Sequence, residues 1–497
     1  MTRRRRRRFS RSAKPTAAAD TGAILPRVAL YWNFTCRFRR PVFRGLMGTH
    51  EEIKTAPAPS ARVETLGCRL NAWESAVISR HLRRLGAPML VVNSCAVTAE
   101  AERQSRQTLR RLRRSNPGAK VVVTGCAATL APERWAQMDG VDAVLVNGEK
   151  LNPNSWRALA IRLGLDPRDS DGDGDGDGDI NGAEINDIGD IDDDDGALEA
   201  HFAAPSPARA FLEIQHGCDH RCTFCTIPFA RGDNRSVSVE RVIARARRLV
   251  DGGVREVILT GVDIASWGGD LENRRGLAFV VAQLLKSLPD LERLRLSSLD
   301  PAALDDDFFA LLASEERLQP HLHLSAQAGD DLTLKRMKRR HLADDLVRIA
   351  ERARRARPGL ALGADVIAGF PTETREMFGR GADLFRALES PFLHVFPDSP
   401  RAGTPASRMP QVAPDERRRR ARSLRGLAAG LQRDYAARLA GERRRALCEG
   451  GGRARIGENL LVALPVDGEP GRIVEVALAR NVSAAGAPLL AGTIVGV

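Results

Sequence analysis

Short apolar runs alternate with amphipathic stretches along most of this 497-residue chain. A helix between two strands carries the chain back to the end at which the first strand began, so the next strand runs in the same direction. The alternation therefore predicts parallel sheets and an α/β fold. The first block predicts strands at Arg62–Leu66, Met89–Asn93, Lys120–Thr124 and Ala143–Val146, with helices at Ala72–Leu85, at Glu100–Arg114 and after Pro132.

The alternation resumes on a larger scale after residue 208. Six parallel strands with crossover helices fit a full or partial β/α barrel, in which chemistry lies at the carboxyl ends of the strands. A basic helix at Pro414–Leu439 then leads to short strands with glycine turns, which predict a small β barrel. The six core strands are expected at Ala210–Gln215, Glu256–Leu259, Arg293–Leu296, His321–Ser325, Leu362–Ile367 and Phe392–Phe396, and the terminal strands at Asn459–Pro465, Gly471–Leu478 and Leu489–Val497.

Two segments of biased composition separate these regions. Residues 1–50 hold thirteen Arg or Lys and a single acid, without helical or strand periodicity. This arm has three interpretations: an RNA-binding tail, an organelle transit peptide, or translated sequence upstream of a true start near Met47. The chain therefore divides into a basic disordered arm (1–60), an α/β domain (61–165), an acidic low-complexity linker (166–207), a β/α core (208–440) and a β barrel (441–497).

The acidic linker carries fifteen acids and one Arg between residues 166 and 200. Its Asp-Gly repeats cannot bury apolar surface, which favours a solvated spacer. Residues Asp173 to Glu184 also satisfy the calcium-loop spacing D-x-D-x-D-G-x-I-x-x-x-E. Any Asp-Gly repeat meets most of that pattern, and no clear amphipathic helix follows it, so a calcium site remains the alternative to the spacer.

Charge is distributed unevenly. The whole chain carries +13, but residues 166–200 carry −14, so the remainder carries +27. This favours a polyanionic partner, with nucleic acid first. The alternative is a codon bias that places Arg on solvated surfaces. No apolar stretch approaches the roughly 18 to 20 residues that cross a bilayer, so we expect a soluble, cytoplasmic protein without a membrane partner.

Six of the eight cysteines form two groups of three, an odd number that disulfides cannot satisfy within a group. Metal ligation in a reducing compartment explains them better. Cys218, Cys222 and Cys225 follow a predicted strand with the spacing C-x3-C-x2-C. One loop can thereby present three thiolates to an iron-sulfur cluster and leave one iron open for catalysis. The alternative is a zinc knuckle completed by His216 or His220.

The second group is spread over three strands. Cys68, Cys95 and Cys126 each follow a predicted strand of the first block. Because the carboxyl ends of parallel strands share one edge, we expect these thiols to converge there. The alternative is three unrelated buried cysteines. Cys36 and Cys448 match no motif, and we expect no function for them.

The segment Q-H-G-C-D-H-R-C-T-F-C, which ends at Cys225, resembles the radical S-adenosylmethionine (SAM) enzymes. The resemblance implies a 4Fe-4S cluster whose open iron binds SAM, and cleavage of SAM to methionine and a 5'-deoxyadenosyl radical. It also implies cofactor contacts from further residues, each of which could instead be ordinary barrel packing. These residues are Phe224 beside the adenine, Thr260, Gly261 and Val262 at the methionyl amino group, and Ser298, Gln327, Asp365 and Ile367 along the pocket.

With the second cysteine group, residues 61–497 resemble the methylthiotransferases, whose amino-terminal domain holds a second 4Fe-4S cluster on three cysteines. Four segments resemble the branch that acts on N6-threonylcarbamoyladenosine beside the tRNA anticodon. The branch acting on isopentenyladenosine usually has G-C-Q-M-N at the first cysteine, and the ribosomal-protein branch G-C-P-K-N. The four segments are T-L-G-C-R-L-N (65–71), H-L-H-L-S-A-Q-A-G-D-D (321–331), L-K-R-M-K-R-R (334–340) and H-V-F-P-D-S-P-R-A-G-T (394–404).

The resemblance implies a transferase that makes the 2-methylthio derivative of this nucleoside, with the anticodon loop of tRNA and an electron donor as partners. We expect a monomer. The terminal barrel occupies the place of the family's RNA-binding TRAM domain. It has few aromatic side chains, so RNA contact is expected from Arg453, Arg455, Arg472 and Arg480. The alternatives are methylthiolation of isopentenyladenosine or of a ribosomal protein, and an iron-sulfur RNA-binding regulator without turnover.

The spacer interpretation of the acidic linker makes a prediction. Deleting residues 170–196 is expected to leave methylthiotransferase activity intact, because a solvated spacer contributes no packing. Activity of the purified deletion variant, compared with the full chain at equal iron content, measures this. A large loss of turnover in a folded variant would contradict the interpretation.

Overall fold

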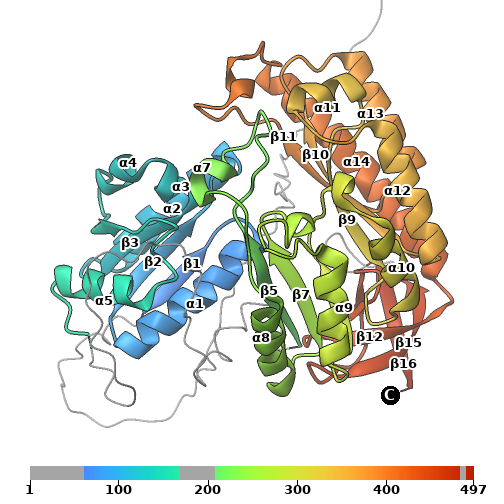
Figure 1. Ribbon diagram of the computed structural model, residues 1–497, viewed down its shortest axis with the longest axis horizontal. Helices are drawn as coiled ribbons and strands as arrows, with labels where there is room; N and C mark the ends of the chain where they lie inside the picture. The colour runs from blue at the N-terminus through green and yellow to red at the C-terminus, as the bar shows by residue number, and fades with distance from the viewer. Residues whose placement is uncertain (1–60, 168–207, 482–488, 497) are drawn as a thin grey trace, which may run out of the picture. The chain divides into compact units, whose positions relative to one another are not determined.

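A four-stranded parallel sheet opens the described part of the chain (Figure 1). Its strand order is β1-β2-β3-β4, and every neighbouring pair is parallel, as predicted. The strands are β1 (Arg62–Thr65), β2 (Met89–Ser94), β3 (Lys120–Gly125) and β4 (Ala143–Val144), and the helices are α1 (Arg69–Leu85), α2 (Ala99–Ser115), α3 (Cys126–Leu130), α4 (Pro132–Ala136) and α5 (Pro153–Arg162).

Helices cover both faces of this sheet. Alternate residues of the inner strand β2 pack into two different apolar clusters, one on each face. Leu90 and Val92 of β2 belong to one cluster, and Met89 and Val91 to the other. All six β2 residues are buried. A continuous apolar run such as this one is typical of a parallel strand that is buried on both sides.

The structure, a computed structural model, describes residues 61–167, 208–481 and 489–496, all of which fall within the compact unit 57–497. The predicted basic arm, nearly all of the acidic linker with its calcium-loop pattern, and Cys36 lie outside these ranges. In the described ranges, no helix is long and apolar enough to cross a membrane.

Two short helices of the first block were not predicted. Helix α3 begins at Cys126, directly after β3, and Gly125 makes this turn at φ +93°. Helix α5 begins with Pro153 after Asn152, whose side chain accepts a hydrogen bond from the Asn154 backbone N–H at 2.9 Å. Helix α5 carries ordinary helix-start signals, an Asn cap followed by Pro. Helix α3 has no side-chain cap and only five residues, too few to show helical periodicity.

The central region is a partial β/α barrel, as predicted. Its six parallel strands follow one another in chain order: one hydrogen-bonded sheet has the order β6-β5-β7-β8, and another has β11-β10-β9. Isolated bridges, Leu294 to Leu318 and Leu299 to Leu324, join the two sheets, whereas β11 and β5 do not pair in the part of the chain that the structure describes. The strands are β5 (Arg209–His216), the antiparallel edge strand β6 (Arg235–Ser236), β7 (Glu256–Gly261), β8 (Arg293–Leu296), β9 (His321–Gln327), β10 (Ala361–Ala368) and β11 (Phe392–Pro397).

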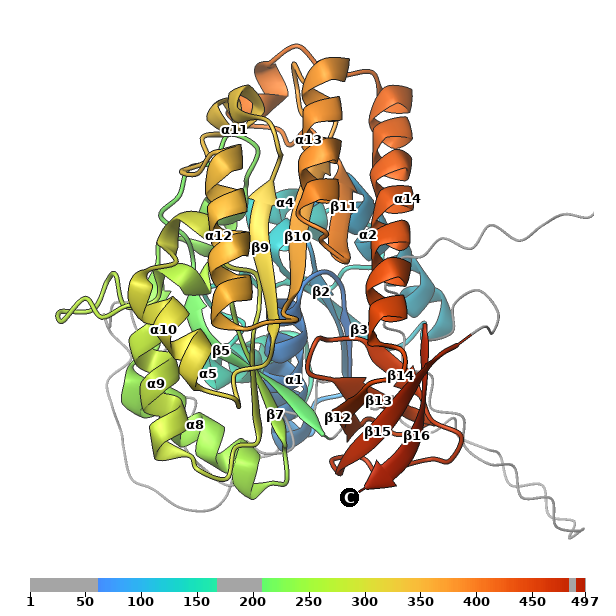
Figure 2. The same ribbon diagram turned by 90° about the vertical axis from the view of Figure 1, so that its right-hand side faces the viewer.

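One large apolar core lies between these strands and the helices that connect them. Figure 2 shows the longest helix, α14 (Pro414–Leu439), running beside β11 and down to the terminal barrel. Its bounds are those predicted from the sequence. The other helices of the region are α7 (Ile227–Arg231), α8 (Val239–Asp251), α9 (Leu277–Ser287), α10 (Asp306–Ser314), α11 (Asp331–Met337), α12 (Ala343–Ala356) and α13 (Arg375–Ala387), with short 3-10 helices at Ile264–Ser266, Pro301–Ala303 and Pro405–Arg408.

The terminal region is a closed five-stranded barrel with the order β12-β13-β14-β16-β15. Three of its strands were predicted, and two were missed because they are rich in arginine, which conceals the alternation of apolar residues. The strands are β12 (Arg443–Cys448), β13 (Arg453–Ile456), β14 (Leu461–Ala463), β15 (Ile473–Arg480) and β16 (Leu490–Gly496).

One of the four arginines expected to contact RNA from this barrel is misassigned. Arg455 is buried and forms an ion pair with Glu449 at 2.5 Å, so its charge does not reach a phosphate. The side chains of Arg453, Arg472 and Arg480 are exposed, as an RNA contact requires.

A buried carboxylate joins the β/α core to the terminal barrel. Glu256, at the start of β7, forms ion pairs with Arg209 at 2.8 Å, Arg293 at 2.9 Å and Arg295 at 2.9 Å. Burial by itself would raise the pKa of Glu256, but the three guanidinium groups hold it well below its usual range. The carboxylate therefore stays ionised at neutral pH.

All three arginines also bind the terminal barrel. Arg209 forms an ion pair with Glu449 at 3.1 Å. Arg293 donates to the backbone carbonyl of Arg455, and Arg295 to that of Gly457, both at 2.9 Å. The guanidinium groups that surround Glu256 are therefore the same groups that contact the barrel.

We predict that Glu256→Gln lowers the free energy of unfolding by about 3–5 kcal/mol, because it leaves three buried guanidinium groups without their shared counter-charge. The folded pKa lies below the unfolded value, so the contribution is complete above a pH of about 4.3 and is lost only as pH falls toward the folded pKa. Urea denaturation at neutral pH measures the change.

The matched control is Glu292→Gln, because Glu292 forms a solvent-exposed pair with Arg445 at 3.1 Å. A change within about 0.5 kcal/mol is expected there. Equal effects of the two substitutions would contradict the role assigned to Glu256.

Candidate functional site

Three cysteines of the amino-terminal domain lie at one edge of its sheet. Cys68 follows β1 and precedes α1, Cys95 follows β2, and Cys126 begins α3 directly after β3. A Cβ atom on Gly67, which has φ +99°, would lie 2.6 Å from the Cys95 sulfur. Only glycine therefore lets the Cys68 loop approach Cys95 this closely. Cys95 and Cys126 are buried, and Cys68 is exposed.

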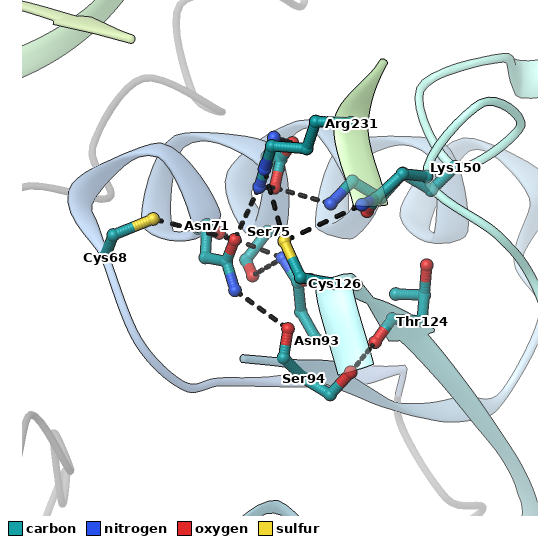
Figure 3. Close-up of polar contacts among 12 residues, drawn as sticks. Cys68, Asn71, Ser75, Asn93, Ser94, Thr124, Cys126, Lys150 and Arg231 are labelled. Atoms are coloured by element: carbon teal, nitrogen blue, oxygen red, sulfur yellow. Dashed lines mark hydrogen bonds and ion pairs between the residues drawn. The ribbon is translucent and has the colours of Figure 1, made fainter. Parts of the chain in front are cut away.

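The side chain of Asn71 fixes the two loops that carry Cys68 and Cys95 (Figure 3). Its Nδ2 donates to the backbone carbonyls of Leu66 at 2.7 Å and Ser94 at 3.1 Å, and its Oδ1 lies 3.8 Å from the Cys68 sulfur. Asn71 stands in the quoted T-L-G-C-R-L-N segment, but the sequence analysis gave it no role.

Arg231 reaches this edge from the central region. Its Nε lies 3.2 Å from the Cys126 sulfur, its Nη2 donates to Asn71 Oδ1 at 2.8 Å, and its Nη1 donates to Glu74 at 2.7 Å (Figure 3). The guanidinium thus connects the Cys68 side of the site, through Asn71, with Cys126. The sequence analysis missed Arg231, because it lies 105 residues from Cys126. Its place just after the C-x3-C-x2-C motif was the available signal.

Glu74 also binds a buried lysine. Lys150 Nζ lies 2.5 Å from Glu74 Oε2, and both side chains are 0 % exposed. Burial would raise the pKa of Glu74, but Arg231 and Lys150 lower it to about 2. The site therefore contains one buried carboxylate between two buried cations.

The buried Cys95 thiol holds its proton. Burial, with a contribution from the neighbouring Cys68 and Cys126, raises the pKa of Cys95 to about 12. Such a thiol ionises only when a metal compensates the thiolate charge. Three converging sulfurs and a buried cation fit an iron-sulfur cluster that is bound by three cysteines.

The C-x3-C-x2-C loop leaves the carboxyl end of β5. A Cβ on Gly217, which has φ +69°, would lie 1.8 Å from the Asp233 carbonyl oxygen, so the turn into Cys218 requires glycine. The Cys218 N–H donates to the Gly232 carbonyl at 3.0 Å and so closes the loop. Burial raises the pKa of Cys218 to about 12 and that of Cys225 to about 11. These thiols also need a metal to ionise.

A second guanidinium contacts this loop. Arg339 Nη1 lies 3.5 Å from the Cys222 sulfur, and its Nη2 donates to the Ser325 carbonyl at 2.9 Å. Its side chain is buried. Each group of three cysteines therefore has one buried arginine against one sulfur. Arg339 was also missed, although it lies in the quoted L-K-R-M-K-R-R segment.

The predicted methionyl contacts Thr260, Gly261 and Val262 lie at the end of β7 and beyond it, beside Gln215. The Val262 N–H donates to Gln215 Oε1 at 3.0 Å, and a Cβ on Gly261 would lie 2.5 Å from the Gln215 carbonyl oxygen. Thr260 is buried. The close approach of this strand end to the β5 strand end depends on glycine.

Two other predicted residues meet in a polar network. Ser298 Oγ donates to Asp365 at 2.9 Å, and the same carboxylate contacts His323 at 3.2 Å and His394 at 3.3 Å. Burial would raise the pKa of Asp365, but the two imidazoles hold it well below its usual range. The sequence analysis quoted both histidines within motifs but gave neither a role.

The remaining predicted residues lie at an apolar wall. Phe224 and Ile367 are partly buried and pack against the same cluster, with the Phe224 and Phe370 rings edge to face at 6.4 Å. Gln327 ends β9 with φ +67°. The structure thus places a polar group at Asp365, within β10, and an apolar group at Phe224, in the loop that follows β5.

The histidines of the zinc alternative have other partners. His220 Nε2 contacts Asp263 at 2.9 Å. His216 Nδ1 lies 3.0 Å from Glu213 and 3.4 Å from Arg231 Nη1. His216 therefore belongs to the Arg231 network.

Comparisons with known proteins agree with this arrangement. A model of the Radical SAM superfamily matches residues 212–385, and a model of the uncharacterized protein family UPF0004 matches residues 60–146. Together they span both groups of three cysteines. The family uses SAM and 4Fe-4S clusters, as predicted.

Named relatives match most of the chain. The "Threonylcarbamoyladenosine tRNA methylthiotransferase MtaB" of Rickettsia prowazekii is 42% identical over 364 residues, which cover 73% of this chain and 81% of the relative. The protein of the same name from Bacillus subtilis is 32% identical and covers 76% and 82%. A "tRNA-2-methylthio-N(6)-dimethylallyladenosine synthase" of Jannaschia sp. is 33% identical and covers 84% and 91%. The chain belongs to the radical SAM methylthiotransferase family.

Proposed function

We propose that this protein converts N6-threonylcarbamoyladenosine next to the tRNA anticodon to its 2-methylthio derivative. One structural observation supports the proposal: Arg231, six residues after Cys225, lies 3.2 Å from the Cys126 sulfur, so the segment that follows one cysteine group contacts the other group. The 42% identity to the Rickettsia relative supports this substrate, as do the four quoted segments.

Each residue group has a proposed task. Cys218, Cys222 and Cys225 hold one cluster, and the amino-terminal cysteines Cys68, Cys95 and Cys126 hold the other. When bound, SAM and the clusters supply the radical and sulfur chemistry that an unactivated aromatic C–H bond requires. The Asp365 network and the Phe224 wall orient SAM through polar and apolar contacts. The residues proposed to contact SAM are Phe224, Thr260, Gly261, Val262, Ser298, Gln327, Asp365 and Ile367.

A cavity beside both cysteine loops supports an RNA substrate. Its volume is about 320 Å³, and its lining includes Ala127 and Thr226, the residues that follow Cys126 and Cys225. Phe229 also lines it and is 66% exposed. Arg134 stands at the same cavity with an exposed side chain. An exposed ring beside a guanidinium suits an unstacked base and its phosphate.

The finer parts of the proposal concern the setting of the enzyme. We propose a cytoplasmic monomer that takes electrons from a separate donor. We also propose domain boundaries at 61–165 and 208–440, with 441–497 as a TRAM-like barrel. Its exposed Arg453, Arg472 and Arg480 support RNA contact through phosphates.

A second candidate is methylthiolation of isopentenyladenosine. The specific observation in its favour is the Jannaschia relative, which is named for dimethylallyladenosine, another name for isopentenyladenosine. Its identity to this chain is 33%, whereas that of the Bacillus protein named for threonylcarbamoyladenosine is 32%. The same measurement on tRNA separates the two candidates.

In cells that lack this gene, bulk tRNA is expected to lose 2-methylthio-threonylcarbamoyladenosine, as measured by nucleoside mass spectrometry. The wild type restores it and Cys222→Ala does not, because that variant lacks one sulfur ligand. Cys448→Ala is the cysteine control and is expected to restore it, since Cys448 lies in the terminal barrel.

The other outcomes are equally informative. Loss of methylthio-isopentenyladenosine alone would establish the second candidate. No change in either nucleoside would remove tRNA adenosine as the substrate and favour a ribosomal protein. If the reconstituted protein, given SAM and a reductant, also forms no 5'-deoxyadenosine, the non-catalytic regulator would be favoured.

Phe229→Ala is expected to weaken binding of an anticodon stem-loop RNA by roughly 5- to 150-fold, because one base loses about 1–3 kcal/mol of stacking. Phe229→Tyr should bind like the wild type. Fluorescence anisotropy with labelled RNA measures both. Ile161→Ala is the control, since Ile161 is a 59% exposed apolar residue on α5 outside this cavity. Unchanged affinity in Phe229→Ala would remove Phe229 from the RNA site.

A further inference from the structure

Arg231 belongs to the central region by sequence, yet its side chain contacts residues of the amino-terminal domain. It ends α7, the short helix that follows the C-x3-C-x2-C loop, and its side chain is 1% exposed. Its three nitrogens contact Cys126, Glu74 and Asn71 at 3.2, 2.7 and 2.8 Å (Figure 3). A buried guanidinium with every nitrogen engaged has one defined position.

A second contact ties α7 to the same sulfur. Asn147 donates through Nδ2 to the backbone carbonyl of Ala230 at 2.8 Å, and the same Nδ2 lies 3.7 Å from the Cys126 sulfur. The Cys126 sulfur therefore faces two N–H donors: Arg231, which belongs to α7, and Asn147, which bonds to the α7 backbone. Hydrogen bonds to cluster sulfurs are among the factors that set the reduction potential.

Arg231 and Lys150 share one carboxylate, Glu74, which both of them bind. A second buried carboxylate, Glu213, bonds to His216, and the Nδ1 of that histidine lies 3.4 Å from Arg231 Nη1. Arg231 Nε lies 3.2 Å from the Cys126 sulfur. The guanidinium therefore places a positive charge directly against one of the three sulfurs.

We propose that Arg231 is a positioning residue for the amino-terminal cluster: it fixes the Cys126 thiolate and makes the assembly and potential of that cluster depend on docked α7. This inference rests on the proposed assignment of Cys68, Cys95 and Cys126 as ligands. It gives the loop of one cluster a direct influence on the other.

The test isolates the amino-terminal cluster. In a background with Cys218, Cys222 and Cys225 all changed to Ala, anaerobic reconstitution is expected to give about four irons per chain. Adding Arg231→Gln should lower iron to about one or less. Arg231→Lys keeps the charge near Glu74 but loses the Nε contact, so it should retain iron and shift the midpoint potential to a more negative value. Iron analysis and redox titration followed by electron paramagnetic resonance give these readouts.

Arg339 provides the matched control. Arg339→Gln in the same background should leave both iron content and potential unchanged, because Arg339 contacts Cys222 of the other group. In the reciprocal background, with Cys68, Cys95 and Cys126 changed to Ala, Arg339→Gln should change the iron content or the midpoint potential of the remaining cluster. Circular dichroism confirms that each variant is folded.

Two results would overturn the proposal, and they are distinguishable. If folded Arg231→Gln and Arg231→Lys both keep about four irons and the potential of their background, Arg231 has no positioning role. If the background itself binds no iron, the ligand assignment fails, and the role of Arg231 fails with it.

Discussion

Parallel strand pairing is the constraint on which the site depends. In the amino-terminal sheet, β1, β2 and β3 run in one direction, so the residues that follow them share one edge, and a cysteine follows each. In the central region the C-x3-C-x2-C loop leaves the same end of β5. An antiparallel arrangement would send neighbouring strand ends to opposite edges and separate the sulfurs. The topology of the sheet therefore determines where the cysteines lie, whichever side chains surround them.

Buried charge then fixes what topology brings together. Glu256 gathers three arginines at the start of β7, and Glu74 gathers Arg231 and Lys150 beside the cysteines. Both carboxylates are fully buried, so each stays ionised only while its cations are in place. Such networks are intolerant of truncation, and they make the position of each partner unique. The first joins the barrel to the core, and the second joins the amino-terminal domain to α7 of the central region.

The sequence predicted the architecture because periodic elements carry their own signal. Helix α14 was predicted with its observed bounds, and all six core strands were predicted within a few residues. The strands β12 and β13 were missed because arginines with long apolar stems occupy positions that the hydrophobic pattern reads as polar. Arg455 was misassigned for a related reason: the sequence does not show whether an arginine on a strand faces solvent or the interior.

The cysteines were visible as candidates because their spacing is local or tied to strand ends. Arg231, Arg339 and Asn71 were not, since their partners lie far away in the chain or depend on how loops close. Arg231 bonds to Glu74 across 157 residues. No periodicity or spacing reports a contact of that kind, and only the folded chain reveals it. The proposed cluster ligands were therefore predicted from the sequence, whereas the residues around them are known only from the structure.

The Glu256 network lies at the amino ends of the core strands, whereas the cysteine loop leaves the carboxyl end of β5. Strand β5 has eight residues, which at roughly 3.3 Å each span about 26 Å. The Glu256 network, which contacts the terminal barrel, therefore lies about one strand length from the C-x3-C-x2-C loop. A substrate that engages both the cavity at Phe229 and the exposed arginines of the barrel must therefore reach over a distance on the scale of one strand.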